Sequence, residues 1–131
     1  MIFVAELIFC QTVVIGRLVN NRTDERLCEQ IAEMIENYED GSGEQIKQIC
    51  IYYDSAITKR NPGVLKIGDS NVRAFSKTWS DVEHMNVILG RDFAECAQNP
   101  EYAAYFASQN WDAFSGDQLI FDGETLHLCV Y

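Results

Sequence analysis

Residues 24–38 carry the clearest structural signal in the chain, an apolar repeat with the period of an α-helix. At 100° per residue, the apolar side chains of this stretch fall within about 100° of arc. They are Leu27, Ile31, Met34, Ile35 and Tyr38. Thr23 precedes the repeat as a predicted N-cap, and the glycine-rich turn at 40–43 follows it. A helix with one apolar stripe needs a core to cover it, which the rest of the chain must supply.

Segments with strand character lie on both sides of this helix. Residues 2–19 are rich in Ile and Val and predict one long bent strand, or two strands joined near Cys10. Residues 46–53 predict a further strand. The Asp122-Gly123 pair stands between two β-prone runs, so the C-terminus is predicted to form a β-hairpin. The turn signals between 61 and 71 predict a meander of short strands at 64–67 and 72–76.

Two further helices are predicted after the meander. Residues 81–97 open with a capping box between Ser80 and Glu83 and carry one apolar stripe that runs through Gly90. The stripe consists of Val82, Met85, Leu89, Phe93 and Cys96. Asn99 and Pro100 predict the start of a shorter helix over 100–110. Its predicted buried side chains are Tyr102, Tyr105 and Phe106.

These elements predict an α+β fold with a mostly antiparallel sheet. Its helices are the two main amphipathic ones (24–38 and 81–97) and the short third one (100–110), and a β-hairpin closes the chain. A length of 131 residues and a hydrophobic content of 47% fit one domain, residues 1–131, with a core of its own.

The cysteines and the N-terminal residues predict a cellular compartment. The five cysteines are widely spaced, and no two of them form a Cys-x-x-Cys pair. This spacing predicts buried thiols in a reducing environment rather than a disulfide framework. The chain lacks a basic leader and Glu6 interrupts its first apolar run, so neither a signal peptide nor a membrane-spanning helix is expected. We therefore expect a cytoplasmic protein with no membrane partner.

The charge of the chain is strongly acidic and unevenly distributed. A net charge of -10 argues against direct binding to nucleic acid. Like charges four residues apart destabilise a helix by a few tenths of a kcal/mol per pair, so an acidic row on the 24–38 helix needs a reason. We predict that this row binds a basic protein partner, and the alternative is a solvated face without a partner. The row consists of Glu25, Glu29, Glu33, Glu36 and Asp40.

Other chemistry-bearing residues give no catalytic motif. A locally basic segment carries no glycine-rich phosphate loop; its residues are Lys59, Arg60, Lys66, Arg73 and Lys77. His84 is predicted to be exposed on the 81–97 helix. His127 and Cys129 are predicted to share one face of the last strand, on a solvent side or at a sheet edge. Two such ligands do not make a metal site, so neither a metal nor a cofactor is predicted.

The leading functional prediction is a non-enzymatic acidic binding protein, acting as an inhibitor, a neutraliser or an adaptor. One alternative is a small-ligand-binding protein or a small enzyme with an aromatic pocket. The aromatic residues predicted to line that pocket are Tyr53, Trp79, Tyr102 and Trp111. A second alternative is a homo-oligomer that pairs its strand edges.

Overall fold

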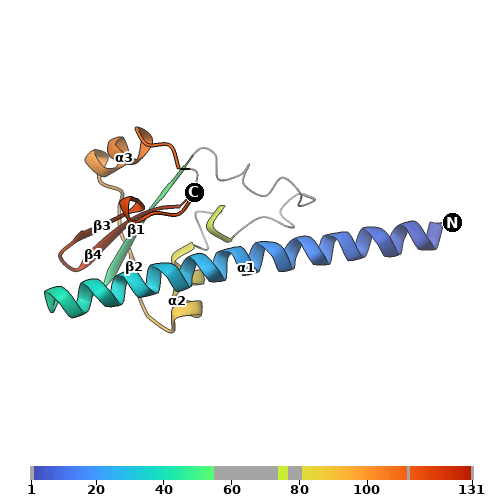
Figure 1. Cartoon of the computed structure of the whole chain (residues 1–131), viewed down its shortest axis with the longest axis horizontal. Coiled ribbons are helices and arrows are strands. Elements are labelled where there is room, and N and C mark those ends of the chain that lie inside the picture. Colours follow the sequence, from blue (N-terminus) through green and yellow to red (C-terminus); the bar gives the residue numbers. More distant parts are fainter. Residues whose placement is uncertain (1, 55–73, 77–80, 112, 131) are drawn as a thin grey trace.

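The structure is a computed structural model that describes residues 2–54, 74–76, 81–111 and 113–130. It has an α+β fold in which helices accompany one four-stranded mixed sheet (Figure 1). The helices are α1 (Ile2–Ser42), α2 (Asp81–Leu89) and α3 (Pro100–Ala107), and the short 3-10 turns are η2 (Ala74–Ser76) and η3 (Gly116–Gln118). The strands are β1 (Gln48–Tyr53), β2 (Ala94–Glu95), β3 (Leu119–Asp122) and β4 (Thr125–Val130).

The prediction of strands over residues 2–19 is wrong, because α1 begins at Ile2 and continues unbroken to Ser42. The predicted 24–38 helix is therefore the C-terminal part of a much longer one. Thr23 is not an N-cap: its hydroxyl donates to the carbonyl of Val19 at 2.9 Å, inside the helix. The β propensity of Ile and Val depends on the packing of their side chains against neighbouring strands. A helix needs no neighbouring strand, because its backbone groups form hydrogen bonds within the helix.

The predicted turn at 40–43 begins too early, because α1 continues through Asp40 and Gly41 and ends at Ser42. Gly43 follows Ser42 with a φ of 76°, and its N–H donates to the carbonyl of Glu39 at 2.9 Å. This is the left-handed C-terminal motif that glycine adopts without a steric penalty.

The sheet has the strand order β2-β1-β4-β3. β1 runs parallel to β4 over six residue pairs and parallel to β2 over two, and only β3 and β4 are antiparallel. The prediction of a mostly antiparallel sheet is therefore wrong, whereas the predicted C-terminal hairpin is confirmed. The long connection between β1 and β4 contains α2 and α3, which is the type of crossover that a parallel pair requires.

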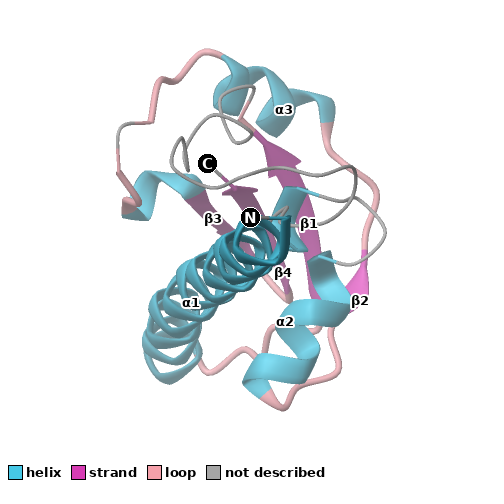
Figure 2. Cartoon of the chain, turned by 90° about the vertical axis from the view of Figure 1, so that its right-hand side faces the viewer, coloured by secondary structure: helices cyan, strands magenta, loops and turns pink. Residues whose placement is uncertain are grey.

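α1 and α2 lie on one side of the sheet and α3 on the other (Figure 2), and the core is divided between the two faces. Side chains alternate along a strand, so Ile49 and Ile51 of β1 point to one face and Cys50 and Tyr52 point to the other. The first face packs against α1 and α2 and contains the larger cluster, including the apolar residues of the α1 repeat. The second face packs against α3 and contains the smaller cluster, which centres on Tyr52 and Phe106.

The predicted helix over 81–97 is too long, because α2 ends at Leu89. Gly90 follows with a φ of 62°, and the side chain of Asn86 then binds both backbone groups of Phe93. The chain turns there and enters β2. Val82 and Met85 are buried as predicted, and Phe93 is also buried, although it lies beyond the helix.

α3 confirms the predicted helix start at Asn99 and Pro100. The Asn99 side chain accepts a hydrogen bond from the Glu101 N–H at 2.9 Å, and Pro100 occupies the first helical position. The helix ends at Ala107, three residues before the predicted end. Phe106 is buried, whereas Tyr105 is 39% exposed, contrary to prediction.

Most of the predicted meander lies outside the described residues, including both turns and the 64–67 strand. The five basic residues of the locally basic segment also lie outside the described residues, as does Ser80 of the predicted capping box. The structure describes only Ala74–Ser76 of the predicted 72–76 strand, and these residues form a 3-10 turn. This turn is tied to α1, because the Ala74 N–H donates to the Asp24 carboxylate at 2.8 Å.

Candidate functional site

The acidic row lies on the side of α1 that faces away from the sheet. All five of its carboxylate side chains are exposed (Glu25, Glu29, Glu33, Glu36 and Asp40). Among the described residues, none of the five forms an ion pair. Arg22 and Arg26 flank the first residue of the row, and the sequence from 27 to 46 contains no Lys or Arg.

Glu39 belongs to the same helix but has a different role. Its carboxylate accepts two hydrogen bonds from the Arg91 guanidinium, at 2.7 and 2.8 Å, and a third from the Ile46 N–H at 2.9 Å. The hydrogen bonds from Arg91 lower the pKa of Glu39, and only 14% of the side chain is exposed. This ion pair joins the end of α1 to the residues that follow α2. Glu39 therefore has a structural role, whereas the carboxylates of the acidic row are exposed to solvent.

The structure does not gather the predicted aromatic pocket residues in one place. Tyr53 packs against the larger cluster on one face of the sheet. Tyr102 and Trp111 belong to the smaller cluster on the opposite face. Trp79 lies outside the described residues.

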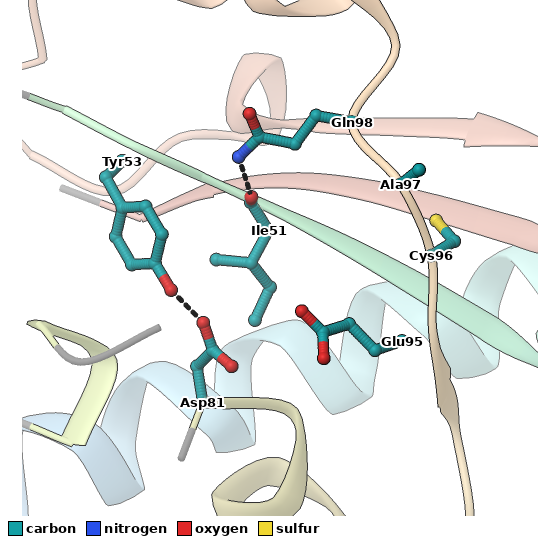
Figure 3. A pocket seen from close by; sticks show the side chains of 7 residues that line it. All are labelled: Ile51, Tyr53, Asp81, Glu95, Cys96, Ala97 and Gln98. Atoms are coloured by element: carbon teal, nitrogen blue, oxygen red, sulfur yellow. Dashed lines mark hydrogen bonds between the residues drawn. The ribbon is translucent and has the colours of Figure 1, made fainter. Parts of the chain in front are cut away.

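A different, polar pocket of about 220 Å³ lies where the end of β1 meets α2 and the segment after β2 (Figure 3). The Tyr53 hydroxyl donates to the buried Asp81 carboxylate, and burial raises the pKa of Asp81. Glu95 and Gln98 complete the polar lining. Pockets that enclose small ligands usually measure about 300–1,000 Å³, so this cavity is small for a metabolite site.

The disulfide beside this pocket contradicts the prediction of five thiols. Cys50 of β1 is bonded to Cys96 just after β2, with their Cα atoms 4.9 Å apart. Cys28 and Cys129 are buried, and Cys10 is exposed on α1. The two bonded cysteines are separated by 46 residues in the chain, so their proximity comes from the parallel pairing of β1 and β2.

The histidines also lie in less exposed places than predicted. His127 sits on β4, which is flanked by strands on both sides, and only 6% of it is exposed. Its Nδ1 lies 3.0 Å from the Tyr52 hydroxyl, and the Tyr102 ring packs against it with centroids 4.3 Å apart. Burial lowers the pKa of His127, because it disfavours the charged form of the ring. His84 is half-buried and packs its ring edge against Phe75.

No metal centre emerges from these groups. Within residues 2–54, 74–76, 81–111 and 113–130, no three potential ligands among His, Cys, Asp and Glu come together.

The hydroxyl of Tyr52 has a structural role, because it accepts a hydrogen bond from the Asn99 N–H at 2.7 Å and also contacts His127.

Within the described residues, most of the exposed large apolar side chains lie on the N-terminal half of α1, for which the sequence predicts strands. Its large side chains are between 43% and 78% exposed. They are Phe3, Val4, Leu7, Ile8, Phe9, Val14, Ile15, Leu18 and Val19. By length and composition this helix could cross a membrane, which corrects the prediction that the chain contains no such segment.

Comparison of the chain with protein-family models, curated proteins and solved structures finds no match in any of the three.

Proposed function

We propose that this protein is a non-enzymatic binding protein that presents the acidic row of α1 to a basic protein partner. The observation that carries the proposal is the contrast within one helix. Glu39 has an arginine partner, whereas the five carboxylates on the outer side are exposed and form no ion pair within the described residues.

The geometry of the row suits a protein that carries several Lys or Arg side chains. Glu25 and Asp40 are 15 residues apart, which corresponds to about 22 Å along a helix. The buried stripe behind the row, including Ile31 and Ile35, fixes the helix against the core. The helix backbone that carries the carboxylates is therefore fixed before a partner arrives, which lowers the entropic cost of binding. A row of like charges also accelerates the approach of an oppositely charged protein.

The chemical groups elsewhere in the described structure support a binding role more than a catalytic one. Glu39 is held by Arg91, Asp81 accepts the Tyr53 hydroxyl, and His127 contacts the Tyr52 hydroxyl. Each of these groups contributes to the fold through its partner.

A charge-neutralising double variant tests the proposal. Glu29→Gln together with Glu33→Gln keeps the size and helix propensity of both side chains. We expect its association with a lysine-rich helical peptide to be roughly three- to tenfold slower at low salt, and less dependent on salt. The melting temperature should hold or rise slightly, since repulsion within the row decreases.

The matched control makes the same two changes away from the row, at Glu83 and Glu101, which are both exposed. This control has the same net charge as the row variant, so it should associate at close to the wild-type rate. If both double variants slow association equally, only net charge matters and the proposed interface is refuted.

A further inference from the structure

The N-terminal half of α1 extends away from the sheet, while the C-terminal half lies along it (Figure 1). Gly16 and Asn20, towards the middle of α1, are buried. The large apolar side chains before them are exposed. An apolar helix that projects in this way needs an apolar environment, and the distribution of its side chains indicates which one.

Apolar side chains surround this half of the helix instead of forming one stripe. Phe9 and Leu18 are nine residues apart, which places them on opposite sides of the helix axis. They are nevertheless exposed to nearly the same degree, 51% and 54%. A helix that packs on one neighbour has an apolar stripe and a polar face, whereas a helix that is apolar all round is surrounded by apolar material.

The length and internal hydrogen bonding of the segment suit the hydrocarbon layer of a bilayer. Residues 2–19 span about 27 Å as a helix, close to the roughly 30 Å of a bilayer core. The ten residues from 7 to 16 carry no charge. Thr12 donates its hydroxyl to the Ile8 carbonyl at 2.8 Å, so this hydroxyl is satisfied within the helix.

The charged residues lie towards the two ends of the segment. Glu6 is about 6 Å from the Ile2 end along the axis, and Arg17 is in the last turn, where a long side chain can reach the headgroup layer. Arg22 and Arg26 follow and are exposed, which places cations where anionic headgroups would lie. Most of the acidic row comes after these arginines, although Glu25 lies between them. Along α1 the apolar segment is therefore followed by two arginines and then mainly by carboxylates.

We propose that residues 2–19 of α1 insert into a lipid bilayer and anchor the α+β domain to it. This proposal goes beyond the proposed binding function and does not depend on it. A cleavable leader fits less well, because small residues usually mark a cleavage site, whereas here the apolar segment continues into Arg17, Asn20 and Arg22 within the same helix. A second copy of the chain fits less well too, because a single partner helix would cover only one side of the segment.

Partition of the full-length chain into vesicles tests the anchor. The protein is mixed with vesicles of phosphatidylcholine alone, or of phosphatidylcholine with phosphatidylserine, in detergent that is then removed. We expect it to float with both kinds of vesicle and to resist extraction by high salt and by alkaline carbonate. Val14→Asp should lower the ratio of bound to free protein by about a hundredfold, since a carboxylate at the middle of a spanning helix is strongly disfavoured.

Val87→Asp is the matched control, because it makes the same chemical change at an exposed valine on α2. Val14 and Val87 are 56% and 81% exposed, so neither change disturbs the core. The control variant should partition within about twofold of the wild type. A second measurement follows Cys10, which is exposed and lies midway along the segment. A charged maleimide that cannot enter bilayers should label Cys10 in detergent-free Val14→Asp protein, and should fail to label it in the vesicle-bound wild type.

Three outcomes would overturn the proposal. Binding only to phosphatidylserine vesicles, with release by salt, would show attachment to the surface by the arginines alone. A wild type that ignores vesicles and forms a discrete oligomer, which Val14→Asp converts to monomer, would show that a second copy covers the segment. A chain recovered from cell membranes without residues 2–19 would show a cleaved leader.

Discussion

The two halves of α1 share one backbone but have opposite relations to the rest of the molecule. Residues 24–42 bury an apolar stripe against the sheet and expose carboxylates. Residues 2–19 expose apolar side chains and belong to the half of α1 that extends away from the sheet (Figure 1). An isolated helix of this length is only marginally stable in water, so the first half needs surroundings that the second half already has. The environment of a helical segment is therefore indicated by the arrangement of its apolar side chains around the axis and not by its helical structure alone.

Thiol reactivity should give the largest difference between the halves. Without vesicles or denaturant, exposed Cys10 should react with a maleimide more than about a thousandfold faster than buried Cys28, which requires the domain to open. Three thiols in total should react after denaturation without reductant, because the Cys50–Cys96 disulfide removes two of the five cysteines. Mass spectrometry of the labelled protein measures both quantities. Five reactive thiols would contradict the disulfide, and equal rates at Cys10 and Cys28 would contradict the division of α1.

The same substitution made in each half of α1 should change the free energy of unfolding by amounts that differ by several kcal/mol. Ile31 is fully buried, so Ile31→Ala should lower the free energy of unfolding by about 2–5 kcal/mol. Ile15 is 60% exposed, so Ile15→Ala should change it by less than about 0.5 kcal/mol. Denaturant titration of the vesicle-free protein measures both values. A large cost at Ile15 would mean that something already packs on the first half in solution.

A smaller difference in unfolding free energy is expected between the ion-paired and the exposed carboxylates in the C-terminal half of α1. Glu39→Gln removes the ionised partner of Arg91 and should cost about 1–3 kcal/mol near neutral pH, whereas Glu36→Gln on the exposed row should cost less than about 0.5 kcal/mol. The pKa of Glu39 is lowered in the folded protein, so its stabilising effect is present above the ordinary pKa of a glutamate. It is lost as the pH falls through the lowered pKa of the folded state.

The pH dependence of unfolding provides the measurement. The wild type should lose stability in acid, and Glu39→Gln should reduce that loss while Glu36→Gln leaves it unchanged. If Glu39→Gln and the wild type follow the same curve, the ion pair with Arg91 contributes nothing to stability in solution.

Local signals in the sequence predicted the elements that depend on neighbouring residues. The apolar repeat from Leu27 to Tyr38, the start of α3 at Asn99 and the hairpin at Gly123 are all confirmed. Each of them depends on a few residues close together: a helical period, a cap and a two-residue turn. The acidic row is exposed because it lies opposite that repeat, although its binding role stays a prediction.

The errors came from features that distant parts of the chain decide. The β propensity of residues 2–19 predicts strands, although the uncharged stretch from 7 to 16 also suits a long apolar helix. The stripe through Gly90 was continuous in sequence, but the side chain of Asn86 binds Phe93 and bends the chain into β2. His127 is buried because β4 lies inside the sheet, and no pattern within β4 gives the strand order.

The β1 edge of the sheet has a consequence for the behaviour of the protein at high concentration. β2 pairs only with Gln48 and Ile49 of that strand. Beyond them, the Cys50–Cys96 disulfide holds the segment after β2 beside this strand, and the Gln98 amide donates to the Ile51 carbonyl at 2.6 Å. Unpaired backbone groups on an edge strand can recruit strands from other molecules and begin aggregation. The disulfide and the Gln98 hydrogen bond both keep other strands from pairing with this edge. The domain should therefore be most prone to form fibres when a reductant opens the disulfide.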